Sequence, residues 1–410
     1  MLDYQQHDEG LRHYQRGVIL ERANRMAEAV EEYRQAVALD PHLREAHVAL
    51  AFYYQRAGLL AKAVDQFQTV VNLEGDFLGY FNLGYLMIEL ERYDDALVAF
   101  EACLSYEPDD PATHFELAYI HCNHGKIERA LEHLQYPLAS YPDDWEIYNL
   151  AGKCYLHLRQ YEQALAAFGQ ALLLAPGIQI QSELLDNIAM VERYREFRSL
   201  QSAKDQMYAR DGIVYLGSAQ DNGIRVAEVQ DYHFTYPDIS TTVQRLMAIC
   251  KGKHWQFTGI VSIDALSLPL ARALSELLDA PIRTVHELTE HDTVLLVMAV
   301  AREAELLLVA SEHIPCTSVA FCMGLNWLRH NQLLPDIVGI VARGVCSVPW
   351  EAELRRLRAD GAGRELLNQC IERATHQIMQ AVHDIPPEGN LSRQVRYYTR
   401  KHRRLSFSTL

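Results

Sequence analysis

Side chains that could bind a metal gather at one point of the sequence, at His121, Cys122 and His124. Histidine and cysteine are ligands that zinc prefers, but the neighbouring sequence supplies nothing to complete the set. We therefore expect a solvated helix end here and predict no metal. Cys316 and Cys322 lie in and beside an apolar segment, and we expect them to be buried, inert thiols.

A second group of polar residues follows segments that we predict to be strands. Asp264 and Ser267 follow one such segment, and Glu305 and Trp327 follow two later ones. Because ligands of open α/β sheets bind outside the carboxyl ends of the strands, these residues define a possible ligand pocket. The alternative is that Asp264 or Ser267 only caps the next helix, and that Trp327 closes the core.

No catalytic signature accompanies these residues. The sequence contains no Gly-rich phosphate loop, no His-Glu-x-x-His helix and no Gly-x-Ser-x-Gly elbow. We therefore name no catalytic residue and expect no cofactor. The eight cysteines form no Cys-x-x-Cys pair and are expected to be reduced. Because the first ten residues are polar and no apolar run reaches 18 residues, we expect a cytoplasmic protein that does not enter the membrane.

The first half of the chain contains an internal repeat of about 34 residues. A proline closes most blocks, an alanine stands twelve residues before it, and a Gly or Ala stands twelve residues further upstream. Two antiparallel helices pack closely only where one of them presents a very small side chain, so these offsets predict helical hairpins. The prolines are Pro41, Pro108, Pro142 and Pro176, the alanines Ala29, Ala96, Ala130 and Ala164, and the upstream residues Gly17, Gly84, Ala118 and Gly152.

Large apolar residues fill the spaces between these positions in the predicted second helices, at Tyr33, Phe67, Phe100, Leu134 and Phe168. The pattern resembles the tetratricopeptide repeat family over residues 10–178, in five blocks. The second block departs from it, with Ala51 and Ala63 in place but Gly75 where the proline belongs. Residues 183–209 resemble the polar-faced helix that covers the last face of such arrays.

The resemblance implies a curved array whose first helices line a concave groove for a peptide or a partner helix. Aromatic and amide side chains suit such recognition because they combine apolar area with hydrogen bonds. Two alternatives stay open: these side chains are packing residues, or the groove holds the second half of the chain. The basic arrangement that would bind a C-terminal carboxylate is absent. The residues expected on the groove are Tyr14, Phe52, Arg56, Asn82, Tyr85, Tyr119, Asn123, Lys153 and His157.

The formal charge of −16 belongs mainly to the repeats, because residues 1–178 contain 27 acidic and 13 basic residues. An acidic surface repels phosphate backbones, so nucleic acid is an unlikely partner for this half. The end of the chain is basic and has the composition of a nucleic-acid or acidic-surface contact, although a solvated terminus or docking on the acidic repeats would explain it as well. Its basic residues are Arg393, Arg396, Arg400, Lys401, Arg403 and Arg404, beside Tyr397 and Tyr398.

In the second half of the sequence, predicted strands alternate with predicted helices. We predict a β-hairpin over 212–229 around Asp221-Asn222-Gly223, and then strands near 257–263, 293–300, 317–323 and 337–342. Helices are expected near 239–251, near 268–278 and up to residue 311. Continuously apolar strands such as Val294-Leu295-Leu296-Val297 predict a mainly parallel sheet covered on both faces.

Within this half, Thr258 to Asp264 and the helix that follows Pro269 are similar to the opening unit of phosphoribosyltransferase-type domains, and 293–300 would match a second unit. That family holds its sugar phosphate with two consecutive acids and a Thr-Gly-Thr turn. Here the corresponding residues are Met298-Ala299 and, further on, 301–304. The resemblance therefore implies the fold without the transferase activity.

These observations predict a multidomain chain with an all-α tetratricopeptide solenoid followed by an α/β domain with a mainly parallel sheet. We expect five repeats over 10–178, a capping or linker helix over 179–209, the α/β domain over 210–350, and C-terminal helices with a basic tail over 351–410. The predicted function is a protein–protein interaction scaffold with a non-catalytic α/β domain. The alternative is a nucleotide or sugar-phosphate sensor, or an enzyme, that the repeats recruit to its target. Oligomeric state is not predicted.

Overall fold

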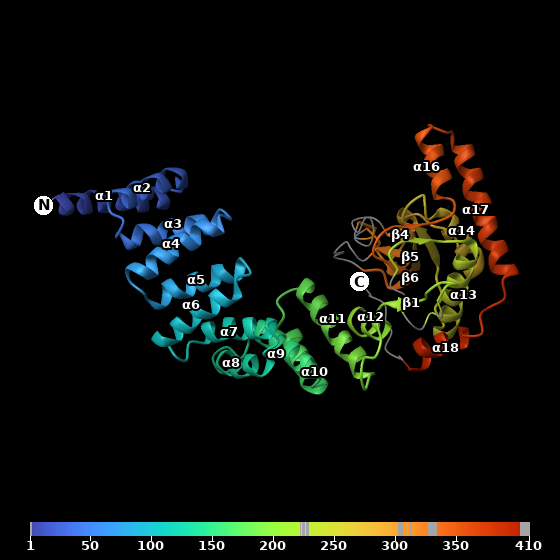
Figure 1. Ribbon diagram of the computed structural model, residues 1–410, viewed down its shortest axis with the longest axis horizontal. Helices are drawn as coiled ribbons and strands as arrows, with labels where there is room; N and C mark the ends of the chain where they lie inside the picture. The colour runs from blue at the N-terminus through green and yellow to red at the C-terminus, as the bar shows by residue number, and fades with distance from the viewer. Residues whose placement is uncertain are drawn as a thin grey trace. The chain divides into compact units, whose positions relative to one another are not determined.

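The computed structural model describes residues 2–221, 223, 226, 229–301, 307, 309–310, 313–326 and 334–401. Contacts within the chain divide it into two compact units, Met1–Leu185 and Asp186–Leu410. Figure 1 shows the helical first unit and the sheet-containing second unit.

The first unit is a row of five antiparallel helical hairpins (Figure 1), as the repeat pattern predicts. Each hairpin joins a first helix to a second helix through a short turn. The pairs are α1 (Leu2–Arg22) with α2 (Met26–Leu39), α3 (Arg44–Arg56) with α4 (Leu60–Leu73), α5 (Phe77–Glu89) with α6 (Tyr93–Tyr106), α7 (Pro111–Asn123) with α8 (Ile127–Ser140), and α9 (Trp145–His157) with α10 (Tyr161–Leu174).

The small residues lie at the closest approach between the two helices of a hairpin. A Cβ added to Gly17 would stand 2.4 Å from the Tyr33 ring, and one added to Gly152 would stand 2.7 Å from the Phe168 ring. In the other hairpins, Ala51 and Ala118 are fully buried at the equivalent place. The predicted close-approach positions are therefore confirmed.

The turns inside the hairpins and the starts of the later first helices also repeat. One residue in each turn has a left-handed backbone, a conformation that glycine adopts without strain. Aspartates begin the later first helices: Asp76 accepts a hydrogen bond from the amide of Gly79 at 2.8 Å, and Asp110 accepts one from Thr113 at 2.7 Å. The left-handed residues are Asn24, Gly58, Glu91, Gly125 and Arg159.

Residues 183–209 form two helices where a single helix was expected. They are the end of α11 (Ile178–Arg195) and most of α12 (Ala203–Asp211). A capping box starts α12, because the Ser202 hydroxyl accepts from the amide of Asp205 while the Asp205 carboxylate accepts from the amide of Ser202. A capping role for this segment stays a prediction.

The second unit contains a five-stranded parallel sheet, which confirms the predicted α/β architecture. A smaller parallel pair, β2 (Tyr232–His233) with β7 (Cys346–Ser347), accompanies it. The order in the main sheet is β1 (Val214–Tyr215), β6 (Ile337–Ala342), β5 (Thr317–Asn326), β4 (Thr293–Ala301) and β3 (Gly259–Ser262).

Both faces of this sheet are covered, which explains its continuously apolar strands. Along β4, Leu295 and Val297 belong to one core, and Val294 and Met298 belong to another. The first core includes side chains of α13 (Tyr236–Lys253), α14 (Leu268–Leu278) and α17 (Arg364–Asp384). The remaining described helices are η1 (Val285–Glu287), α16 (Glu351–Ala359), α18 (Leu391–Arg396) and the π-helix η2 (Tyr397–Lys401).

The β-hairpin predicted over 212–229 is wrong. A turn does form, because the Asp221 carboxylate accepts a hydrogen bond from the amide of Gly223 at 2.6 Å. However, Val214 pairs in parallel with Ile337, and Val229 bridges to Ala342. Both segments thus pair with the buried strand β6, and this pairing prevails over the local turn. The helix predicted up to residue 311 falls mostly outside the described residues.

Candidate functional site

A row of exposed aromatic rings runs along the first helices of successive hairpins. Phe52 on α3, Tyr85 on α5 and Tyr119 on α7 are 33 or 34 residues apart, and each directly follows a small close-approach residue. Their exposed fractions are 40%, 41% and 37%. Because consecutive helical residues point about 100° apart, the residue after the close-approach position is turned away from the second helix. We call Phe52, Tyr85 and Tyr119 the aromatic row.

Two rings of the row have aromatic neighbours. The Phe52 ring meets the Phe67 ring edge-on at 5.3 Å, and the nearby Tyr119 contributes to a raised pKa of Tyr93, whose largest cause is burial. In the fifth hairpin the equivalent position is the exposed Lys153. The row therefore presents aromatic faces, and rings of this kind lose little side-chain entropy on binding.

Three carboxylates act electrostatically on the middle ring of the row. Burial raises the pKa of Tyr85, and the charges of Glu89, Glu116 and Glu146 raise it further. Burial and the neighbouring Glu146 raise the pKa of Glu116 to about 7. These carboxylates come from three successive first helices: α5, α7 and α9. We call Tyr85, Glu89, Glu116 and Glu146 the acidic–aromatic cluster.

The histidines of the fourth hairpin contact one another. Nδ1 of His114 lies 2.8 Å from Nδ1 of His133, and Nε2 of His114 lies 2.9 Å from the carbonyl oxygen of Pro108. Nε2 of His114 therefore donates to the Pro108 carbonyl, and a hydrogen bond joins the two Nδ1 atoms. Burial, together with the neighbouring His114 and His121, lowers the pKa of His133 to about 4. The geometry is that of a structural, hydrogen-bonded pair.

The histidines singled out in the sequence are separated by this packing. His121 lies beside His133, with 5.3 Å between the ring centroids, whereas His124 meets the edge of the Tyr93 ring. The neighbouring Cys154 of the next hairpin lowers the pKa of the Cys122 thiol. Within the ranges that the structure describes, no three His, Cys, Asp or Glu side chains are placed to share a metal ion.

In the second unit, Asp264 and Ser267 are hydrogen-bonded to each other after β3. Oδ1 of Asp264 accepts from the amide and the hydroxyl of Ser267, at 2.7 and 2.5 Å. The Ser267 hydroxyl is buried and accepts from the amide of Ala299 in β4 at 2.8 Å. The two side chains thus join β3 and β4 at the edge where a pocket was predicted. Glu305 and Trp327 lie outside the described residues, so the pocket stays a prediction.

The tyrosines of the basic C-terminal segment lie inside the second unit. Tyr398 is fully buried, and its hydroxyl bonds to the backbone amide of Tyr215 at 2.9 Å. The ammonium group of the buried Lys204 lies 4.7 and 4.6 Å from the ring centroids of Tyr397 and Tyr398. These rings anchor the segment and are not displayed for base stacking. Residues 402–410 lie outside the described part of the chain.

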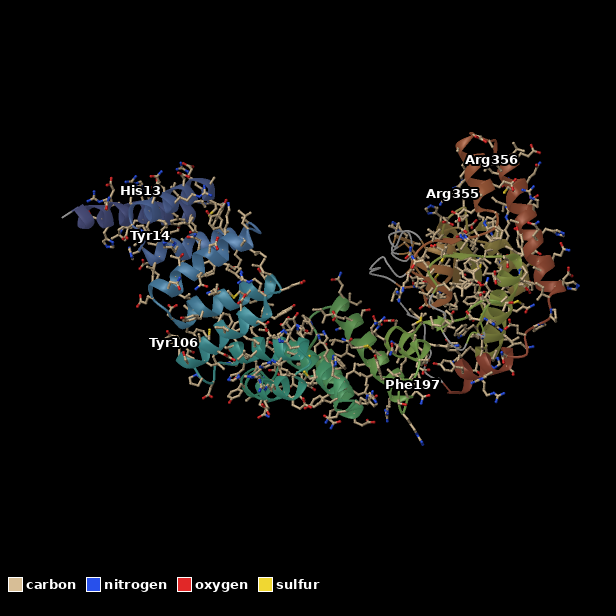
Figure 2. All side chains as sticks on the ribbon, viewed as in Figure 1. His13, Tyr14, Tyr106, Phe197, Arg355 and Arg356 are labelled. Atoms are coloured by element: carbon tan, nitrogen blue, oxygen red, sulfur yellow. The ribbon has the colours of Figure 1, made fainter. Side chains whose placement is uncertain are left out.

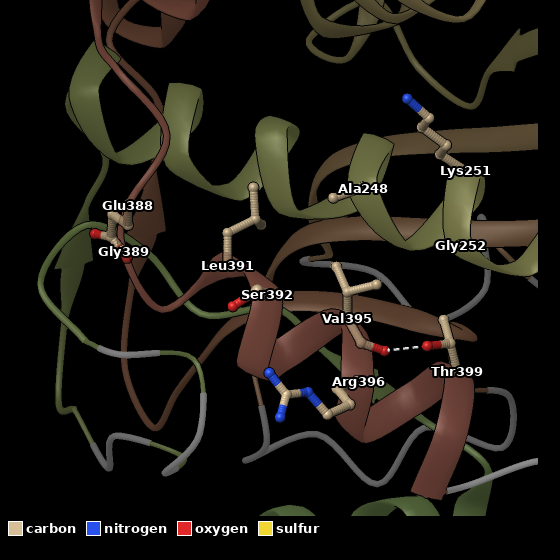
Figure 3. Close-up of a pocket in the computed structure, with 10 residues that line it drawn as sticks. All are labelled: Ala248, Lys251, Gly252, Glu388, Gly389, Leu391, Ser392, Val395, Arg396 and Thr399. Atoms are coloured by element: carbon tan, nitrogen blue, oxygen red, sulfur yellow. Dashed lines mark hydrogen bonds between the residues drawn. The ribbon is translucent and has the colours of Figure 1, made fainter.

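A cavity of about 740 Å³ lies beside this segment (Figure 3). One side comes from α13, with Ala248, Lys251 and Gly252, and the other from residues 388–399. Within the second wall, the Thr399 hydroxyl donates to the carbonyl of Val395 one helical turn earlier, at 2.7 Å. Its lining is mixed, and Lys251 and Arg396 are its basic residues.

Comparison with known proteins identifies the first unit. A tetratricopeptide repeat family model matches residues 11–43, and the model of anaphase-promoting complex, cyclosome, subunit 3 matches residues 89–171. The first half of this chain is a tetratricopeptide repeat array. Both matches end before the α/β unit.

Relatives of the array come from distant organisms. A TPR repeat-containing protein of Methanocaldococcus jannaschii is 26% identical over 129 residues, which cover 31% of this chain and 23% of that protein. Protein O-mannosyl-transferase TMTC1 of Homo sapiens is 27% identical over 197 residues, which cover 46% of this chain and 22% of that protein. This chain thus spans less than a quarter of the length of either relative.

Solved structures match the same half. YrrB, described as a TPR protein with an unusual peptide-binding site, is 19% identical and has a TM-score of 0.39; the match covers 42% of this chain and 89% of YrrB. A structure of MamA protein is 18% identical and has a TM-score of 0.39, with 41% of this chain and 92% of that chain covered. No helix in the described ranges combines the length and apolar character needed to cross a membrane.

The tetratricopeptide array places the residues predicted for the groove on successive first helices, though in different environments. Tyr14, on α1 (Figure 2), is half-buried, and its ring centroid lies 5.9 Å from that of Tyr33. Arg56 pairs with Glu21 at 3.0 Å. The side-chain amide of Asn82 donates to the carbonyl of Leu78 one turn earlier, at 2.7 Å. The side chains of Asn123, Lys153 and His157 are exposed.

Sequence reasoning missed the three carboxylates of the acidic–aromatic cluster. A signal for one of them was available, because Glu116 occupies the repeat position that Asn82 occupies in the third hairpin. Glu146 lies at the start of α9, far in sequence from Tyr85. Only the stacking of hairpins brings it close to that ring.

Proposed function

We propose that the tetratricopeptide array holds a peptide or a partner helix along its first helices, so that the chain acts as a protein–protein interaction scaffold. The aromatic row carries this proposal. A ring that is about two-fifths exposed at the same place in three successive repeats is costly in water and useful for binding.

Removal of two rings of the row tests the proposal. Full-length protein and the double variant Tyr85→Ala, Tyr119→Ala would be used as bait in parallel, with proteins recovered from the native host identified by mass spectrometry. Tyr141→Ala is the matched control, because Tyr141 is an exposed tyrosine at the end of α8 and not on a first helix. We expect the double variant to lose partners that the control retains. Identical recovery by all three proteins would remove the support for the groove.

The second candidate function is a small-molecule site in the α/β unit. After α14, Ile282 forms a β-bridge to β3, along the edge of β3 that does not pair with β4. The chain then passes back across β3 to form β4. The α14 side chains lie in one core, and Leu307 and Ile314, between β4 and β5, lie in the other. The connection that leaves β3 and the connection that leaves β4 therefore cover opposite faces of the sheet. Open α/β sheets bind ligands at such a switch point.

A thermal-shift panel of nucleotides and sugar phosphates tests this second candidate, with Asp264→Ala as the comparison. Stabilisation of the native protein but not of the variant would support a site at the β3–β4 edge. The resemblance to phosphoribosyltransferase-type domains remains a hypothesis about ancestry. At its acidic positions this chain has Met298 and Ala299, both buried in β4, and we propose no transferase activity.

A further inference from the structure

The charged residues of the first helices have an uneven distribution along the array. On α5 and α7, the Asp, Glu, Lys and Arg residues are Glu89 and Glu116, both acidic. The next first helix, α9, adds Glu146 at its start and Lys153 two turns later. The part of the surface around Tyr85 therefore has carboxylates and aromatic rings but no basic side chain from α5 or α7.

Two acidic side chains elsewhere on the array's first helices have basic partners. Glu21 binds Arg56, and Asp8 binds Arg12. In the described array, the carboxylates of Glu89, Glu116 and Glu146 make no ion pair with a lysine or arginine. Glu116 is half-buried and close to a second carboxylate, so its ionised form is unfavourable.

A positively charged side chain would remove this cost. It would neutralise two adjacent carboxylates, and the face of the Tyr85 ring would attract it through the ring quadrupole. The neighbouring rings of the aromatic row, Phe52 and Tyr119, lie one repeat to either side and would contact apolar residues of the same segment. The excess of acidic residues over the whole array adds a long-range attraction for a cationic partner.

From these observations we infer that the groove selects a basic partner segment, with a lysine or arginine side chain inserted between Tyr85, Glu116 and Glu146 and apolar residues laid on Phe52 and Tyr119. This inference rests on the proposed function and names the chemistry of its partner. An acidic segment, or one that ends in its carboxylate at this point, would be repelled by the same three glutamates.

Fluorescence anisotropy with labelled peptides tests the inference on the full-length chain. The probes are three peptides that share one extended leucine–serine scaffold and carry lysine, glutamate or glutamine at the variable positions. The variants are Glu116→Gln, Glu146→Gln and Tyr85→Ala. Glu128→Gln is the control, because it removes the same charge from an exposed position on α8, a second helix.

We expect the lysine peptide to bind and the glutamate peptide not to bind. Glu116→Gln or Glu146→Gln should lower the affinity for the lysine peptide about tenfold, which corresponds to ~1.4 kcal/mol. Glu128→Gln should leave this affinity within about twofold of the native value. Tyr85→Ala should weaken it as well. Circular dichroism of each variant checks that the array remains folded.

The possible failures are distinguishable. If the glutamine peptide binds as tightly as the lysine peptide and both need Tyr85, the groove binds peptides but the basic partner is wrong. If the lysine peptide binds and neither glutamate variant weakens it, the inserted cation is wrong. If the lysine peptide does not bind, or binds the Tyr85→Ala variant as tightly as the native protein, the inference is overturned. The pull-down with the double variant tests the scaffold proposal separately.

Discussion

A methyl group on Gly84 would stand 2.9 Å from Cζ of Phe100, closer than real Cβ atoms approach a neighbour. The two helices of the third hairpin are therefore in contact at this point through a backbone and a ring, and Phe100 itself is fully buried. The same relationship recurs between Gly152 and Phe168, which shows that the array depends on one repeated contact.

Gly84→Val should destabilise the array, because the branched side chain has to displace the Phe100 ring or the whole helix. We expect a loss of ~2 kcal/mol or more in the free energy of unfolding, as for overpacked cores. Urea titration followed by circular dichroism measures it. Gly169→Ala is the control, since nothing lies within 4 Å of a Cβ at this helical position, and it should stabilise α10 by ~0.5 kcal/mol or more. Equal effects of the two changes would contradict the close-approach interpretation.

Gly58→Ala tests the hairpin turns independently of packing. Gly58 has φ of +70°, and a Cβ there would meet nothing within 4 Å. Any loss of stability must then come from the left-handed backbone, which costs an alanine ~1 kcal/mol. The same urea titration applies, and an unchanged midpoint would show that the turn can adopt another conformation.

The raised pKa of Glu116 makes stability depend on pH in a predictable direction. Its pKa rises from 4.5 to about 7 on folding, so the unfolded chain loses this proton at lower pH than the folded protein does. The carboxyl group therefore destabilises the fold increasingly between about pH 4.5 and 7, and its full cost remains above pH 7.

Glu116→Gln removes that cost. Its melting temperature should exceed that of the native protein at about pH 8, and the difference should shrink at about pH 5, where the folded protein holds Glu116 protonated. Thermal melts of native protein, Glu116→Gln and the exposed control Glu128→Gln at both values decide this. A gain that is the same at both pH values would show that burial of a charge is not its cause.

In the α/β unit, Ser267→Ala should cost ~1–3 kcal/mol, because it leaves the buried amide of Ala299 without its acceptor. Denaturant unfolding, monitored by the fluorescence of the tryptophans, measures the change. Ser262→Ala is the comparison, since the Ser262 hydroxyl contacts only the backbone carbonyl of Asp264 at 2.7 Å and is partly exposed. If Ser267→Ala is as mild as Ser262→Ala, the link between β3 and β4 is not what holds this edge.

The repeat array could be predicted from the sequence because its defining contacts are local. Gly17 meets Tyr33 and Gly84 meets Phe100, each pair sixteen residues apart, so the fixed offsets of small and large residues are visible in the linear chain. The strands β4 to β6 were equally visible, since a strand that is buried on both faces is continuously apolar. Phe52, Tyr85 and Tyr119 followed from the same repeat register.

Other features depended on residues that only the folded chain brings together. The turn at Asp221 predicted a hairpin, but Val214 pairs in parallel with Ile337, which lies more than a hundred residues away. Glu146 approaches Tyr85 because hairpins stack, and Ser267 meets Ala299 because β3 and β4 are neighbours. The amino-acid sequence by itself determined the hairpins and the apolar strands, since neighbouring residues encode them. The tertiary structure decided which strands pair and which charges surround the aromatic row, because backbone hydrogen bonding and desolvation act between segments whose distance the linear chain does not record.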